Sequence, residues 1–169
     1  MKKPFAELWP VLAEAFAWDG SWRDIYIIGA GNDAWNAVLQ WICSGERPFR
    51  LTTGGNVLED YPRDIGMLVA AENRELSNLI FEISGIAVNC HFFEIETVEF
   101  DIDPRQVNSD NWPDLAEFLL GLSRVAERPC LLTEENAQEQ VIAVADFAKG
   151  SVTADRSYPG AFELPRISI

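Results

Sequence analysis

Hydrophobic and polar residues follow two different rhythms along the chain, and the change between them separates helical segments from sheet-forming ones. Near the N-terminus, apolar residues recur every three or four positions from Phe5 to Phe16, which predicts one helix that ends near Trp18. The run RDIYIIG, at residues 23–29, is apolar with little interruption, as is typical of a strand buried on both faces. The chain is therefore expected to open with a helix and a buried strand.

Helical spacing returns after the glycine turn that follows this strand. Asn32 or Asp33 can cap a helix that ends at Gly45. The segment PFRLTTGG, at 48–55, predicts a strand that ends at the glycine pair. The segment YPRDIGMLVAAENRE, at 61–75, predicts a weaker helix with proline in its first turn.

From residue 76 to 103 the period shortens to two, which predicts three successive antiparallel strands. Ser84 and Gly85 have the composition of a tight hairpin turn between the first two strands. The third strand should place apolar residues on one face and acids on the other: Val98, Phe100 and Ile102 against Glu99, Asp101 and Asp103. The segment is interpreted as a meander with one face in water.

The most regular helical pattern begins after Asn111. This residue is a favourable N-cap, and Pro113 lies in the first turn behind it. Two later apolar runs, at 130–132 and 141–148, predict two further strands.

Together these elements predict an α+β fold. The sheet is expected to be mostly antiparallel, with a three-strand meander, and to be covered by helices in two layers. With 169 residues, of which 48% are hydrophobic, the chain can fill one core. We expect this single domain to occupy residues 1–150, followed by an irregular C-terminal tail at 151–169.

Acidic residues outnumber basic ones by 27 to 13, which gives a net charge of −14. Such a field repels nucleic acids and anionic membranes and favours encounter with a basic protein, although it also serves solubility alone. Glu7 and Glu14 interrupt the N-terminal segment where a signal peptide would need apolar residues. We therefore expect no nucleic-acid partner and no membrane partner.

Thiol and imidazole groups are sparse. The three cysteines (Cys43, Cys90 and Cys130) are widely spaced and His91 is the only histidine, so a four-ligand zinc site is not expected. Cys90 and His91 are neighbours on a strand and should point to opposite faces, which is a poor geometry for a catalytic pair. The odd cysteine count favours free thiols in the cytoplasm, and no cofactor is expected.

The stretch GAGNDAW has the spacing of a dinucleotide-binding loop, with Gly29, Gly31 and Ala34 at the three small-residue positions. That loop also requires an acidic residue at the end of the next strand, and PFRLTTGG carries none there. Asp33 adds negative charge where phosphates would bind. We interpret Gly29 and Gly31 as residues of a tight turn, with nucleotide binding as the alternative.

The acids Glu99, Asp101 and Asp103 alternate along the third meander strand. They can form a solvated face or a surface that docks a basic protein. The alternative is chemical, since such a row could bind Mg²⁺ or Ca²⁺ or supply a general acid and base. Only His91 is available to assist that chemistry.

Trp22 and Trp41 fit the predicted buried stripes poorly. They are candidates for an exposed patch that binds a partner or joins two copies in a homodimer. The alternative is that they cover the end of the sheet, because large aromatic residues are usually buried.

Three stretches (WRDIYI, GIAVNCHFF and VEFDIDPR) make residues 22–135 resemble an uncharacterised family of small acidic bacterial proteins. The chain also resembles, more loosely, the immunity proteins that neutralise toxins, which are small acidic α+β domains without active sites. The resemblance implies a bacterial origin and carries over no catalytic residue. We therefore expect a non-enzymatic interaction module, with an immunity-type inhibitor of a basic toxin as one form. The alternative is a small nucleotide- or metal-dependent enzyme.

Overall fold

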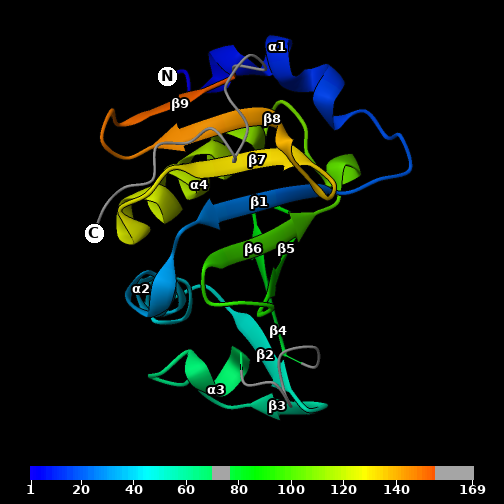
Figure 1. The fold of residues 1–169 in the computed structure, drawn as a ribbon. Coiled ribbons are helices and arrows are strands. Elements are labelled where there is room, and N and C mark those ends of the chain that lie inside the picture. The colour runs from blue at the N-terminus through cyan, green and yellow to red at the C-terminus, as the bar shows by residue number, and fades with distance from the viewer. Residues whose placement is uncertain (70–76, 155–169) are drawn as a thin grey trace.

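The computed structural model describes residues 1–69 and 77–154, and a nine-stranded sheet forms its centre (Figure 1). The strand order is β3-β2-β4-β5-β6-β1-β7-β8-β9, and all neighbouring strands are antiparallel. The strands are β1 (Arg23–Ile28), β2 (Phe49–Thr53), β3 (Asn56–Leu58), β4 (Asn78–Ile83), β5 (Ile86–His91), β6 (Thr97–Ile102), β7 (Cys130–Glu134), β8 (Ala137–Asp146) and β9 (Ser151–Thr153). The helices are η1 (Ala6–Leu8), α1 (Trp9–Leu12), η2 (Ala13–Phe16), α2 (Gly31–Cys43), α3 (Gly66–Val69), η3 (Pro104–Gln106) and α4 (Trp112–Ala126). The α+β class and the antiparallel sheet are confirmed.

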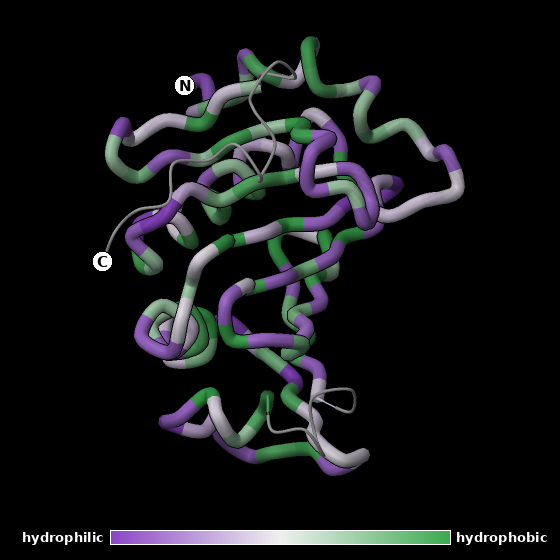
Figure 2. Tube along the Cα trace, in the orientation of Figure 1, coloured by the Kyte–Doolittle hydropathy of each residue, from purple (hydrophilic) through white to green (hydrophobic). Residues whose placement is uncertain are grey.

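Alternation along the strands gives the sheet two different faces, and Figure 2 shows hydrophobic and hydrophilic residues alternating near its centre. One face belongs to the main core and includes Ile25, Val88, Phe100 and Leu132. Helix α4 packs against β7, β8 and β9, and α2 packs against α4 (Figure 1). Among the described residues, the apolar cluster on the opposite face is small and consists of Ile28, Leu131, Val141 and Val144. The expected coverage by helices in two layers stays a prediction.

The N-terminal segment forms three short helical pieces instead of the single helix that its spacing predicted. Pro10 lies in the first turn of α1, where its missing amide hydrogen is tolerated and where it restarts the helix. The apolar stripe still packs as expected. Phe16 contacts Trp9 and Trp112, with ring centroids 5.7 and 6.0 Å apart.

Two helix caps differ from those expected. Helix α2 begins at Gly31 with Ala30 at its N-cap, so neither residue predicted as its cap has that role. Asn111 occupies the N-cap position of α4 but makes no capping hydrogen bond. Its Nδ2 donates instead to the carbonyl oxygens of Ser84 (3.3 Å) and Gln106 (2.8 Å). Asn111 therefore ties the β4–β5 turn to the start of α4.

The sheet extends further at both ends than the sequence predicted. Gly54 and Gly55 turn the chain back directly after β2, so β3 is added beyond the predicted strand. At the other end, Val152 of β9 pairs with Ala145 of β8, within the segment expected to be irregular.

Two predicted segments lie partly outside the described residues. Within the helix expected at 61–75, α3 occupies four residues, and residues 70–76 are outside the description. Residues 155–169 of the expected C-terminal tail are also outside it.

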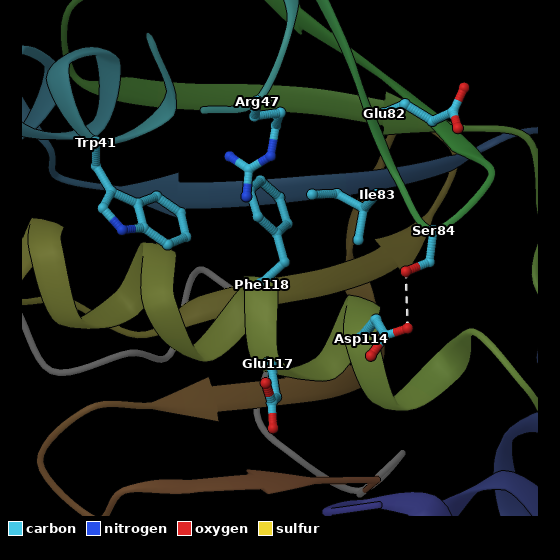
Figure 3. Close-up of a pocket in the computed structure, with 8 residues that line it drawn as sticks. All are labelled: Trp41, Arg47, Glu82, Ile83, Ser84, Asp114, Glu117 and Phe118. Carbon is cyan, nitrogen blue, oxygen red and sulfur yellow. Dashed lines mark hydrogen bonds between the residues drawn. The ribbon is translucent and has the colours of Figure 1, made fainter. Parts of the chain in front are cut away.

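Helices α2 and α4 approach closely at Gly121. A Cβ atom added to Gly121 would lie 2.5 Å from two ring atoms of Trp41, so the glycine provides the space for this ring. The Trp41 ring stacks on Phe118, with centroids 5.5 Å apart and planes 19° apart (Figure 3). Trp41 is thus half-buried between the two helices.

Candidate functional site

The sheet face opposite the main core carries polar and titratable side chains at its centre. They project from three neighbouring strands (β5, β6 and β1) whose registers place them side by side. We call this group the open-face cluster, and it consists of Asp24, Tyr26, Asn89, His91, Glu99 and Asp101.

Asp101 has the most hydrogen bonds within the open-face cluster. It lies between Asp24 of β1 and Asn89 of β5 in the sheet register. Asn89 Nδ2 donates to Asp101 Oδ1 at 2.8 Å, and His91 Nε2 donates to Asp101 Oδ2 at 2.5 Å. The His91 ring in turn stacks on Phe93, with centroids 5.1 Å apart. Strand β5 therefore holds the Asp101 carboxylate in one orientation.

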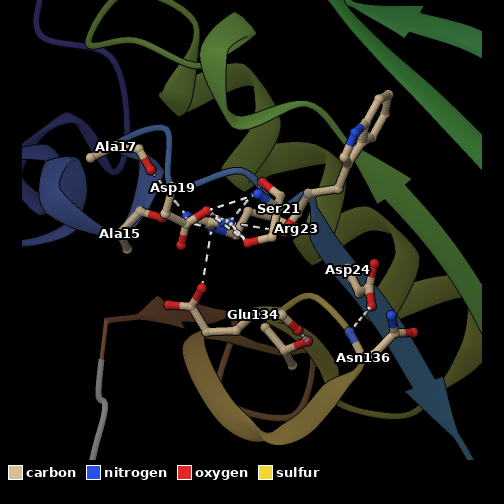
Figure 4. Close-up of polar contacts among 10 residues, drawn as sticks. Ala15, Ala17, Asp19, Ser21, Arg23, Asp24, Glu134 and Asn136 are labelled. Carbon is tan, nitrogen blue, oxygen red and sulfur yellow. Dashed lines mark hydrogen bonds and ion pairs between the residues drawn. The ribbon is translucent and has the colours of Figure 1, made fainter.

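Glu99 lies opposite Tyr26 of β1, and Asp24 follows two residues from Tyr26 on the same face. Asp24 Oδ2 accepts hydrogen bonds from the Tyr26 hydroxyl (2.9 Å) and from the Asn136 amide (2.7 Å; Figure 4). Asn136 belongs to the β7–β8 turn, and Asp24 is only 4% exposed. Glu99 and Asp101 are partly exposed, so these two acids are accessible to a partner.

Burial and neighbouring charges shift the acidities in the open-face cluster. Desolvation raises the pKa of Glu99, and the Asp24 carboxylate raises it further. Desolvation is also the main cause of the raised pKa of Asp24. The pKa of His91 is raised chiefly by its hydrogen bond to Asp101. The pKa of Tyr26 is raised by desolvation and by Asp24, so its phenol stays protonated.

The acids of the open-face cluster receive little compensation from positive charge. In the described part of the chain, no Lys or Arg forms an ion pair with Asp24, Glu99 or Asp101, and the ion pair of His91 is with Asp101. Asp24 and Asp101 lie directly opposite each other on adjacent strands, where like charges are destabilising. Natural proteins retain such costly arrangements mainly at functional sites.

These pKa shifts predict an unusual dependence of stability on pH. A group whose pKa is raised on folding contributes most stability below its unfolded pKa and loses it as the pH rises through its folded pKa. This applies to His91, Glu99 and Asp24. The melting temperature is expected to rise as the pH is lowered from about 8 to about 5. It should fall again below about pH 4, where the acids with lowered pKa values become protonated: Asp19, Asp103 and Asp114.

The variant Glu99→Gln tests this origin of the pH dependence. It should raise the melting temperature at neutral pH and flatten the profile of melting temperature against pH. The gain in the free energy of unfolding should be less than about 1 kcal/mol, because water screens a half-buried carboxylate. The exposed residue Glu139 provides a control, since Glu139→Gln removes the same charge elsewhere. If differential scanning calorimetry gave the wild type and Glu99→Gln the same dependence of melting temperature on pH, Glu99 would not be a source of that dependence.

The predicted row of three acids is divided in the structure. Strand β6 ends at Ile102, and Asp103 caps η3 by accepting the Arg105 amide at 2.9 Å. The Asp103 carboxylate also pairs with the Arg105 guanidinium at 2.8 Å, and this hydrogen bond lowers the pKa of Asp103. Glu99 and Asp101 thus remain in the open-face cluster. Among the described residues, no group of three or more His, Cys, Asp or Glu side chains could hold a metal ion.

The glycine stretch forms a tight turn from β1 into α2. Gly29 and Gly31 both have φ of 73°, a conformation that glycine adopts readily. The Ala30 amide donates to the Glu96 carbonyl at 2.8 Å, and the Gly31 amide donates to the Ile95 carbonyl at 3.1 Å. These two donors are therefore already used, and both neighbours of β1 are antiparallel. The geometry supports the turn interpretation.

The two candidate tryptophans lie on different elements. Trp41 is half-buried on α2, and Trp22 is half-buried directly before β1. The most exposed tryptophan is Trp18, at 48%, and the Arg105 guanidinium lies 3.9 Å from the centre of its ring. A partner-binding or dimer-forming role for Trp22 and Trp41 stays a prediction.

Sequence reasoning missed three members of the open-face cluster. Asp24 and Tyr26 fall within RDIYIIG, which indicated a strand without a polar face, and Asn89 was not singled out, whereas His91 was named as the one residue that could assist the acids. One signal was available, because Asp24 and Tyr26 are two residues apart and must share a face of β1. The pairing of β1 with β6, which brings them to Glu99 and Asp101, has no local signal in the sequence.

Comparison with protein-family models, with curated proteins and with solved structures gives no match. The resemblance to small acidic bacterial proteins and to immunity proteins stays a prediction. In the described residues, no helix combines the length and the apolar character needed to cross a bilayer.

Proposed function

We propose that this protein is a non-enzymatic interaction module that binds a basic protein through the open-face cluster. The observation that carries this proposal is a set of acids that no Lys or Arg of the described chain pairs with: Asp24 and Asp101 lie directly opposite each other, and Glu99 is adjacent. A lysine or arginine side chain from a partner would relieve the repulsion and lower the raised pKa values. The net charge of −14 would also speed the encounter.

The surroundings of the open-face cluster suit a long cationic side chain. Glu99 and Asp101 are partly exposed, while Asn89 and His91 fix the orientation of Asp101. Phe93 is 46% exposed and stacks on His91 at the edge of the cluster. Its ring offers apolar surface for the methylene groups of lysine or arginine. An immunity-type inhibitor of a basic toxin would be one protein with this binding mode.

The test compares two double variants that change the net charge equally. Glu99→Gln with Asp101→Asn alters the open-face cluster, whereas Glu7→Gln with Glu14→Gln alters exposed acids of the N-terminal segment. Partners captured from a native lysate are quantified for each tagged protein, and thermal melting confirms that each is folded. A basic protein should be retained by the wild type and by the N-terminal variant, and its affinity for the open-face variant should fall about tenfold or more.

Binding kinetics with the purified partner then distinguish specific docking from general electrostatic attraction. Its association rate should fall with rising salt, and the open-face variant should also dissociate faster. Equal binding by both double variants would contradict docking at the open-face cluster. A basic partner that loses the same affinity for both double variants would also contradict it, because such a loss reflects only the overall charge.

A second candidate function is a small enzyme, and the His91–Asp101 hydrogen bond favours it. A carboxylate that binds one imidazole nitrogen orients the ring and strengthens the other nitrogen as a base. In the described chain, His91 Nδ1 has no hydrogen-bond partner. This candidate predicts that a nucleotide or a divalent ion raises the melting temperature and that His91→Gln removes the effect. No shift at saturating NAD, FAD or Mg²⁺ would contradict it.

A further inference from the structure

A second site lies away from the open-face cluster, on the side of the sheet that carries the main core. It is a pocket of about 430 Å³ between the end of α2, the β4–β5 turn and the first half of α4 (Figure 3). Its lining combines aromatic rings and one arginine with three acids: Glu82, Asp114 and Glu117. The lining residues on which the inference depends are Trp41, Arg47, Phe118, Ser84, Asp114 and Glu117.

Arg47 is the feature of this pocket that requires explanation. Its guanidinium carbon lies 5.5 to 5.7 Å from the centres of three aromatic rings: Trp41, Phe81 and Phe118. These rings attract the cation but accept none of its N–H groups as a carboxylate would. In the described chain, no acid forms an ion pair with Arg47. A half-buried guanidinium is thus held in place with its donors available to a ligand.

The opposite wall is acidic, and one of its two acids is already paired within the chain. Ser84 Oγ donates to Asp114 Oδ2 at 2.7 Å, and Lys3 Nζ lies 3.1 Å from the same oxygen. Asp114 is therefore compensated within the chain. Glu117 is one helical turn further along α4, is exposed, and has no ion-pair partner in the described chain. Figure 3 shows Arg47 above the Phe118 ring and Glu117 below it, so these two charges lie on different sides of the pocket. Glu82, which is exposed and also has no ion pair in the described chain, lines the pocket on the same side of the Phe118 ring as Arg47.

We propose that this pocket binds a small zwitterion, with a carboxylate on Arg47 and an amine on Glu117. A simple anion would meet the acids of the α4 wall, and a simple cation would be repelled by Arg47. A molecule with both charges, separated by a short apolar chain, satisfies both walls and places its methylene groups beside Trp41 and Phe118. This inference does not depend on the function proposed for the open-face cluster.

The test uses three probes of matched length in isothermal titration calorimetry: 6-aminohexanoate, hexanoate and hexylamine. The zwitterion 6-aminohexanoate is expected to bind saturably at one site and about tenfold more tightly than either singly charged probe. The NMR signal of the Trp41 indole N–H should move during the titration. Absence of saturable binding, or equal binding of hexylamine, would overturn the proposal.

Two variants assign the ends of the ligand. Arg47→Gln should weaken binding of both carboxylate probes, while Glu117→Gln should weaken 6-aminohexanoate about fivefold and leave hexanoate unchanged. Glu117 is exposed, so its variant remains informative even if Arg47→Gln does not fold. Glu139→Gln, with the same charge change on β8, should bind 6-aminohexanoate like the wild type. Affinities that are unchanged in both pocket variants would show that the probe binds elsewhere.

Discussion

Replacement of Arg23 by alanine is expected to lower the free energy of unfolding by about 3 to 4 kcal/mol, because it leaves buried groups without their charged partner. Arg23 is at the start of β1 and is 1% exposed. Its guanidinium compensates several groups at once, so its removal leaves backbone carbonyls without donors. Denaturant unfolding monitored by tryptophan fluorescence measures the loss.

The contacts of Arg23 join the N-terminal segment to the sheet (Figure 4). Arg23 Nε donates to the Ala15 carbonyl at 2.7 Å, and Nη2 donates to the Ala17 carbonyl at 3.2 Å. Nη1 donates to the Trp22 carbonyl at 2.9 Å. Glu134 Oε2 of β7 lies 3.5 Å from Nε, which adds an ion pair across two strands. A single buried cation thus holds the end of η2 and the residue after it against β1 and β7.

Two further variants show whether the stability that Arg23 contributes comes from its hydrogen-bond geometry or from its charge. Arg23→Lys keeps the charge, but a single ammonium group cannot replace the donors on Nε, Nη1 and Nη2 that reach separate carbonyls, so it should lose most of the same stability. Asp19→Asn should cost much less, because Asp19 is exposed and contributes only one of the partners. A fully stable Arg23→Lys variant would contradict the role given to the guanidinium geometry.

Substitution of Gly121 by valine is expected to lower the free energy of unfolding by about 2 kcal/mol. A Cβ atom at this position would lie 2.5 Å from the Trp41 ring, so the ring must leave its stack on Phe118. Thermal melting and a change in tryptophan fluorescence should report the displacement together.

The Gly121→Ala substitution is expected to change stability in opposite directions in the wild type and in a Trp41→Ala background. In the wild type it should destabilise the protein, because the clash outweighs the gain of about 1 kcal/mol that alanine brings to a helix interior. In a Trp41→Ala background the clash is absent, and the same substitution should stabilise the protein. Equal effects in the two backgrounds would show that the ring does not restrict this position.

The meander was predictable because its signals are local. Alternation defined β4, β5 and β6, and Ser84 and Gly85 both adopt the positive φ values (45° and 84°) of the predicted tight turn. The helix at 112–126 was predictable for the same reason, since its apolar stripe is continuous. By contrast, Pro10 interrupts a stripe whose spacing alone indicates one helix.

The candidate site was only partly predictable because its parts are far apart in the sequence. Glu99 and Asp101 were recognisable as acids on one strand face. Asp24 joins them through the pairing of β1 with β6, and Arg47 meets its aromatic rings through the packing of α2 against α4. Such contacts depend on which strands become neighbours, and hydrophobic periodicity carries no information about that choice.

The position of β1 in the sheet also affects how the protein is made. β1 is synthesised before every other strand, yet its two neighbours are β6 and β7, which emerge from the ribosome much later. The strands β4 to β6 and β7 to β9 each pair in sequence order and can form as local units. Until β1 inserts between them, β6 and β7 expose unpaired edges that favour aggregation. Insertion of β1 therefore both completes the sheet and protects the newly made chain.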